Sequence, residues 1–189
     1  KIINVQKVTE NRALQNEEIS ALIKAIGTGI KTQFNGDESR YDKIIFLTDA
    51  DVDGAHIRTL LLTFFFKFMP GLITGGKVWI SEPPLYRLKA SSGITYLKDD
   101  DALTKFKKEN KNKKFDTSRF KGLGEMNAGE LWETAMNPET RTLIKVTLAD
   151  AKSAMAKASD MFEILMGNDV SKRKQFIEKN AKDVRFLDV

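Results

Sequence analysis

One stretch in the first half of the chain most constrains its fold, because an apolar run, an acidic turn and a second apolar segment follow one another there. The run is Lys43-Ile-Ile-Phe-Leu-Thr48, the turn covers residues 49–54, and the second segment covers residues 56–69. A short, continuous apolar run is typical of a strand in a parallel sheet that is covered on both faces. The second segment is apolar nearly all round and predicts a helix buried against that sheet.

The neighbouring segments extend this alternation of strands and helices. Residues 2–5 predict a short strand, a helix begins after Asn16 and ends at Gly27, and residues 77–81 predict a further strand. Strand, helix, strand, helix, strand is the α/β pattern. We therefore expect a parallel sheet flanked by helices.

The sequence after Pro83-Pro84 predicts different elements. Residues 85–97 are typical of a hairpin that turns at Ser91-Ser92-Gly93. Residues 99–110 predict a helix, because acids stand at its start and lysines at its end, as the helix dipole favours.

A domain boundary is expected near residues 110–118, where apolar residues become sparse. We predict a first domain over residues 1–115 and a smaller, mainly helical tail over residues 116–189. Within that tail, Asn127 and Glu130 have the spacing of a capping box and predict the start of a helix.

Composition excludes several kinds of chemistry. The 189 residues include no cysteine, which removes disulfides, thiolate zinc sites and cysteine nucleophiles. The most apolar stretch, residues 60–69, is far shorter than the ~18 residues that a membrane span needs, so we expect no membrane partner. The chain starts at Lys1 without a signal-peptide pattern, which predicts a cytoplasmic protein cut from a longer one.

The acidic turn is the sharpest chemical feature. Asp49, Asp51 and Asp53 alternate along the chain directly after the apolar run. In an extended backbone, residues two apart point the same way, so three carboxylates are expected to meet at the end of the strand, where α/β sheets place their sites. A cation must neutralise them, and oxygen ligands select Mg²⁺ or Ca²⁺.

Two other interpretations account for parts of this turn. Asp-x-Asp-x-Asp-Gly opens an EF-hand loop, but the twelfth position is Leu60 rather than Glu, and a strand precedes it, so we reject the EF-hand. Alternatively, the acids cap the following helix, which explains one carboxylate and leaves two unexplained. The chain's one histidine, His56, is either a structural hydrogen-bonding group or a phosphate contact.

Basic residues are concentrated between Lys105 and Lys121, where eight Lys and Arg residues stand against two acids. This excess exceeds the net charge of +5 of the whole chain and suits a polyanionic partner, although a solvated surface explains it equally well.

Arg119-Phe-Lys121-Gly122-Leu-Gly124-Glu125-Met126 is the second concentrated motif. Its two glycines permit positive φ and close approach to another chain, and Lys121 and Glu125 carry opposite charges beside them. A tight surface turn is the other interpretation.

Taken together, these segments resemble the B subunits of bacterial DNA gyrase, a family of type IIA topoisomerases. The resemblance spans nearly the whole chain and rests on motifs in the same order as in that family. They are Thr48-Asp-Ala-Asp-Val-Asp-Gly-Ala-His-Ile-Arg, Pro83-Pro-Leu-Tyr86, Lys121-Gly-Leu-Gly-Glu-Met-Asn127, Leu131-Trp-Glu-Thr134, Met136-Asn-Pro138 and Leu165-Met-Gly167. It implies a TOPRIM fold, with a Rossmann-like parallel sheet flanked by helices, followed by the helical tail.

The resemblance implies roles for individual residues. Asp49 and Asp51 would bind catalytic Mg²⁺ and Asp53 would support them, with Mn²⁺ or Ca²⁺ as substitutes. Lys1, Asn4 and Lys121 would contact DNA, and Gly122, Gly124 and Glu125 would contact the partner subunit. His56 is added to the predicted DNA contacts because it lies close enough to the acids to meet a phosphate. The family's metal site also uses a glutamate from a segment that would precede Lys1.

The resemblance also implies a reaction and partners. A tyrosine of the gyrase A subunit attacks a phosphate of double-stranded DNA within an A₂B₂ heterotetramer. ATP is bound by the full-length B subunit and not by this chain. We expect this chain alone to bind Mg²⁺ weakly and to leave DNA uncut. The alternatives are a topoisomerase IV B subunit, another TOPRIM enzyme such as a primase or nuclease, and a non-enzymatic basic DNA-binding module.

Overall fold

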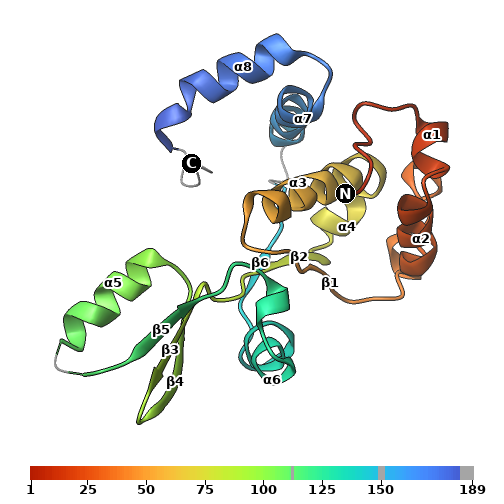
Figure 1. Ribbon diagram of the computed structural model, residues 1–189. Coiled ribbons are helices and arrows are strands. Elements are labelled where there is room, and N and C mark those ends of the chain that lie inside the picture. The colour runs from red at the N-terminus through yellow and green to blue at the C-terminus, as the bar shows by residue number, and fades with distance from the viewer. Residues whose placement is uncertain (112, 149–151, 184–189) are drawn as a thin grey trace. The chain divides into compact units, whose positions relative to one another are not determined.

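The computed structural model describes residues 1–111, 113–148 and 152–183, and it has a mixed α/β fold (Figure 1). The predicted α/β class is confirmed. The described residues divide into two compact units, the first within Lys1–Ile44, His56–Trp79 and Lys145–Val189 and the second within Ile45–Ala55 and Ile80–Ile144. Each helix that the structure describes is too short or too polar to cross a bilayer.

The elements of the chain follow in this order: α1 (Glu10–Leu14), α2 (Glu17–Ile26), β1 (Ile44–Phe46), α3 (Val52–Phe68), α4 (Pro70–Thr74), β2 (Val78–Ser81), β3 (Tyr86–Ala90), β4 (Gly93–Leu97), α5 (Asp100–Glu109), β5 (Asp116–Arg119), α6 (Ala128–Leu131), β6 (Leu143–Lys145), α7 (Lys152–Met166) and α8 (Val170–Lys179). One sheet has the strand order β1-β2-β6 and the other has the order β4-β3-β5.

The first unit has an aromatic core built on α3. Phe64, Phe65 and Phe68 are fully buried, and the Phe64 ring meets the other two at centroid distances of 5.2 and 5.7 Å. The predicted buried helix is confirmed. It begins at Val52, several residues before the predicted start at residue 56.

The predicted strand over residues 2–5 is wrong, because residues 2–4 have no regular secondary structure and Val5 lies in a turn. The Asn4 side chain accepts a hydrogen bond from the backbone N–H of Gln6 at 3.0 Å, and the N–H of Lys7 donates to the Asn4 carbonyl at 3.1 Å. Such local bonds from asparagine compete with strand pairing. By contrast, α2 begins and ends as predicted, with Asn16 as its N-cap and Gly27 in the left-handed conformation at φ 86°.

The second unit is built on the antiparallel sheet of β3, β4 and β5. The predicted hairpin is confirmed as β3 and β4, with Tyr86 opposite Leu97 and Ala90 opposite Gly93. The predicted helix over residues 99–110 is also confirmed as α5, whose N-cap is Asp99.

Strand β5 bears on the expected domain boundary. It pairs with β3, with Tyr86 opposite Arg119 and Lys89 opposite Asp116. Residues on both sides of residue 115 therefore belong to the same compact unit. The division into residues 1–115 and 116–189 does not coincide with these units, and it stays a prediction about domains.

Candidate metal centre

The acidic turn lies in the second unit, between the end of β1 and the start of α3. Asp49 and Asp51 occupy the connection, whereas Asp53 lies in the first turn of the helix. The expectation that all three acids follow one extended backbone is therefore wrong for Asp53. All three side chains are exposed.

Asp51 determines where α3 begins. Its Oδ1 accepts a hydrogen bond from the backbone N–H of Gly54 at 2.7 Å, and its carbonyl accepts one from the N–H of Ala55 at 3.0 Å. These two bonds are those of a helix N-cap. The capping interpretation is therefore correct for Asp51, and it uses only one of that carboxylate's two oxygens.

Asp49 is held from a distant part of the chain. Its Oδ1 accepts a hydrogen bond of 2.7 Å from the backbone N–H of Leu123, a residue 74 positions later. Leu123 begins a single 3-10 turn, Leu123–Glu125, which follows Gly122. The structure thus brings the acidic turn and the glycine motif together.

Two glycines allow these approaches to Asp49. A Cβ on Gly122 would lie 2.9 Å from Asp49 Oδ1 and 3.0 Å from its Cγ, and a Cβ on Gly54 would lie 2.0 Å from the Asp49 carbonyl oxygen. Neither glycine of the motif uses the positive φ that glycine permits, because Gly122 is extended at φ −160° and Gly124 has no positive φ. Gly122 suits its position because it has no side chain, which leaves room for the Asp49 carboxylate of the same chain.

The rest of the motif forms a compact turn. The backbone N–H of Lys121 donates to Glu125 Oε2 at 2.8 Å, and the N–H of Glu125 donates to the Gly122 carbonyl at 3.2 Å. A Cβ on Gly124 would meet nothing within 4 Å, so this glycine faces open space. Lys121, Gly124 and Glu125 are exposed, as a contact with another molecule requires.

These acids fit the common kind of magnesium site, in which protein ligands surround only part of the ion. Within the described part of the chain, no group of three or more His, Cys, Asp or Glu side chains gathers as a cage. Mg²⁺, however, keeps several waters and is usually held by one or two carboxylates together with substrate phosphates. Asp49 and Asp51 each have one oxygen fixed by a backbone N–H and offer the other as a hard ligand.

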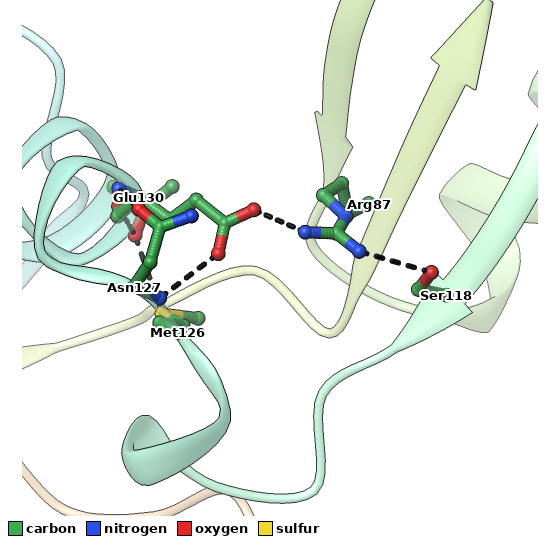
Figure 2. A network of polar contacts seen from close by, with 6 residues as sticks. Arg87, Ser118, Met126, Asn127 and Glu130 are labelled. Atoms are coloured by element: carbon green, nitrogen blue, oxygen red, sulfur yellow. Dashed lines mark hydrogen bonds and ion pairs between the residues drawn. The ribbon is translucent and has the colours of Figure 1, made fainter.

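A network of charged and polar side chains connects β3, β5 and α6 (Figure 2). The sequence predicted only one part of it, the capping box of Asn127 and Glu130. The buried Glu130 carboxylate, in the first turn of α6, forms an ion pair with Arg87 of β3 and accepts the backbone N–H of Asn127 at 3.0 Å. Arg87 also donates to the Ser118 hydroxyl of β5 at 3.3 Å. The network therefore joins β3 and β5, which precede the glycine motif in the sequence, to α6, which follows it.

Glu130 and Arg87 shift each other's pKa. The pKa of Glu130 lies below its usual value, first because the Asn127 N–H stabilises the carboxylate and second because Arg87 does. The same ion pair raises the pKa of Arg87. The Arg87 guanidinium also lies 5.7 Å from the centroid of the Phe120 ring. Phe120 is buried and directly precedes Lys121 in the sequence.

Three predicted DNA contacts lie in the first unit. The Asn4 amide donates to the Met166 carbonyl of α7 at 2.9 Å, which gives this residue a structural role. Lys1 is exposed, and His56 is exposed on α3. Their DNA contacts stay predictions.

The predicted basic run is an exposed surface of the second unit. Lys105, Lys107 and Lys108 are exposed on α5, and Lys111, Lys113 and Lys114 are exposed after it. None of these six lysines forms an ion pair with the residues that the structure describes. Their charges are therefore available to a polyanion.

Comparison with known proteins gives two family matches. Residues 1–83 match the Toprim domain, and residues 112–178 match the carboxyl terminus of the DNA gyrase B subunit. Asp49 lies in the first match and Leu123 in the second, so their hydrogen bond joins the two matched regions.

Individual relatives extend over the whole chain. It is 51% identical over 189 residues to the DNA gyrase B subunit of Thermotoga maritima and 51% identical over 189 residues to that of Mycoplasma genitalium. It is 50% identical over 186 residues to that of Thermus thermophilus. These alignments cover 100%, 100% and 96% of this chain, which spans only 29%, 28% and 29% of the three relatives.

Proposed function

We propose that this chain, which belongs to the DNA gyrase B subunit family through its Toprim and carboxyl-terminal regions, forms the magnesium-binding and DNA-binding part of a type II topoisomerase. The observation that carries the proposal is the Asp49 carboxylate, which is exposed in the connection after β1 and fixed by the Leu123 N–H. This arrangement presents a preorganised ligand close to Gly122, which the exposed Lys121 precedes in the sequence.

The reaction that these residues would support is reversible transesterification. The hydroxyl oxygen of a tyrosine from the gyrase A subunit attacks a DNA phosphate, the bond from phosphorus to the 3′-oxygen breaks, and a 5′-phosphotyrosyl bond and a free 3′-hydroxyl result. Bound Mg²⁺ would supply Lewis-acid stabilisation of the phosphate and of the 3′-oxygen. Asp49 and Asp51 would hold it, Asp53 would support them, and Lys121 would contact the phosphate backbone.

The wider setting belongs to the same proposal. Two copies of the B subunit would join two gyrase A subunits on double-stranded DNA in the cytoplasm, and Gly122, Gly124 and Glu125 would contact the partner. ATP bound elsewhere in the B subunit would drive strand passage and negative supercoiling.

A second candidate is a DNA-binding module without catalysis, which the capping role of Asp51 favours. Asn replacements distinguish the two candidates. Asn is as good an N-cap as Asp, so Asp51→Asn keeps the helix start and removes only the charge. Asp49→Asn likewise keeps an oxygen that can accept the Leu123 N–H.

The test uses the full-length B subunit that contains this chain, together with the A subunit and plasmid DNA. We expect Asp49→Asn and Asp51→Asn each to abolish Mg²⁺-dependent cleavage while DNA binding persists. Asp101→Asn, which removes an exposed acid from α5, is the control and should cleave normally. Cleavage at the control level in either variant would exclude the metal site and favour the binding module.

A further inference from the structure

We infer that the loop Lys121–Glu125 is a positioning element for the metal ligand Asp49, so that metal binding and the order of this loop are coupled. The inference rests on the proposed function, because it requires Asp49 to bind Mg²⁺. Its starting point is the hydrogen bond from the Leu123 N–H to Asp49 Oδ1.

The loop restricts the Asp49 carboxylate on one side. The hydrogen bond from the Leu123 N–H fixes one carboxylate oxygen at 2.7 Å. The Gly122 Cα lies so close to the carboxylate that a side chain on it would collide with Asp49. An exposed aspartate otherwise samples several rotamers, and holding one of them lowers the entropic cost of binding a cation. Groups that orient a metal ligand commonly change metal affinity by about 10- to 100-fold.

The other side of Asp49 is restricted by α3, the helix that follows it. The Asp49 carbonyl approaches Gly54 so closely that a Cβ there would lie 2.0 Å away, and Gly54 is buried. The Asp49 backbone is therefore held by the first turn of α3 and its side chain by the loop. Both contacts lie within the second unit.

The loop itself is held by its own hydrogen bonds, including the bond from the Lys121 N–H to Glu125 Oε2. Its exposed charged residues, Lys121 and Glu125, are available to other molecules. A partner that orders this loop would thereby order Asp49. By thermodynamic reciprocity, a metal ion on Asp49 would also order the loop.

A proline substitution at Leu123 removes the hydrogen bond in question together with the leucine side chain. Leu123 is the first residue of its 3-10 turn, a position where proline is tolerated, and the extended Gly122 before it is compatible with proline. Leu123→Pro therefore loses the N–H with little cost to the backbone. Leu123→Ala loses the same side chain and keeps the N–H, which makes it the matched reference.

A second variant tests the same contact from Gly122. Gly122→Ala meets no backbone strain at φ −160°, but its methyl group would displace the Asp49 carboxylate, which is the movable end of a short side chain. Asp49→Asn is the reference for loss of the ligand itself.

The experiment uses isothermal titration to measure the Mg²⁺ affinity of the full-length B subunit, and amide hydrogen exchange of residues 121–125 with and without Mg²⁺. We expect Leu123→Pro to bind Mg²⁺ about tenfold more weakly than Leu123→Ala, and Gly122→Ala to be weakened similarly. Mg²⁺ should slow exchange in the loop of the wild type but not of Asp49→Asn. In cleavage assays with the A subunit, the half-saturating Mg²⁺ concentration should rise about tenfold in Leu123→Pro, while the maximum at saturating Mg²⁺ stays that of Leu123→Ala.

Equal Mg²⁺ affinity in Leu123→Pro and Leu123→Ala would overturn the inference, as would a reduced cleavage maximum with an unchanged Mg²⁺ requirement. If Leu123→Pro fails to fold, wild-type Mg²⁺ affinity in Gly122→Ala overturns it. If Asp49→Asn has lost Mg²⁺ binding, these results overturn only the role of the loop, and the proposed metal site stands. Wild-type affinity in Asp49→Asn would instead refute the metal site itself, and this inference with it.

Discussion

Replacing Glu130 by Gln tests the contribution of one buried carboxylate to the second unit. The Glu130 side chain is 7% exposed and accepts hydrogen bonds from Arg87 and from the Asn127 N–H. Gln has nearly the same shape and also occurs in capping boxes, but it keeps only one of the two oxygens that accept these bonds, so the substitution removes the negative charge and one of the two hydrogen bonds.

The expected loss follows from the two hydrogen bonds. A hydrogen bond to a charged group contributes about 1.5–3 kcal/mol, whereas a neutral one contributes about 1 kcal/mol. The Arg87 side chain is 33% exposed, and solvent screening reduces the gain from its charge. Because one of the two bonds is lost and the other becomes neutral, we expect Glu130→Gln to lower the free energy of unfolding by about 2–3 kcal/mol at neutral pH.

The pH dependence has a definite sign. The pKa of Glu130 is lowered in the folded protein, whereas an unfolded Glu titrates near about 4.3. The stability from the ionised carboxylate is therefore complete above that pH and is lost as pH falls through the folded pKa. The difference between wild type and Glu130→Gln should shrink below about pH 4.

Urea unfolding followed by circular dichroism, with hydrogen exchange of the Glu130 amide, measures this difference. Asn127→Ala is the control, because it removes the cap that accepts the Glu130 N–H at 3.0 Å and should cost about 1 kcal/mol with little pH dependence. A difference between wild type and Glu130→Gln that is absent at neutral pH, or equally large in acid, would refute the assignment to an ionised, hydrogen-bonded carboxylate.

Two further predictions concern DNA affinity and the core. Replacing Lys111, Lys113 and Lys114 by Gln should flatten the slope of log affinity against log salt by about 2–3, because each phosphate contact releases counterions. Equal flattening after the same replacement of Lys172, Lys174 and Lys179 on α8 would mean that the run has no special role. Phe64→Ala should lower the free energy of unfolding by about 3–5 kcal/mol and Phe64→Leu by less, because Phe64 is fully buried. Urea titration checks this, and a loss under about 1 kcal/mol would contradict the packing described for α3.

Local signals in the sequence predicted the elements whose ends depend on residues two to four positions apart. Asn127 and Glu130 form a complete capping box, with both reciprocal hydrogen bonds. The hairpin of β3 and β4 and the N-cap Asp99 of α5 follow the same kind of rule. These features were predictable because the side chain that ends or begins an element lies beside it in sequence.

The failures come from competition between local signals. Residues 2–5 have a strand-like composition, yet the Asn4 side chain bonds the Gln6 N–H and stabilises a turn. At the acidic turn, alternation of Asp residues suggested extended backbone, but Asp51 is also a strong N-cap. The cap prevails and draws Asp53 into the helix, so spacing along the sequence misjudged which acids share a direction.

The contact that matters most for the site could not be read from either motif alone. Spacing predicted Asp49 as a metal ligand and the two glycines as a means of close approach, but a hydrogen bond across 74 residues is a property of the fold. Only the position of Gly122 beside the carboxylate distinguishes it from Gly124, which faces open space. The two glycines of one motif therefore differ in consequence: an alanine at Gly124 should leave Mg²⁺ affinity unchanged, whereas the same methyl group at Gly122 displaces the carboxylate on which the proposed chemistry depends.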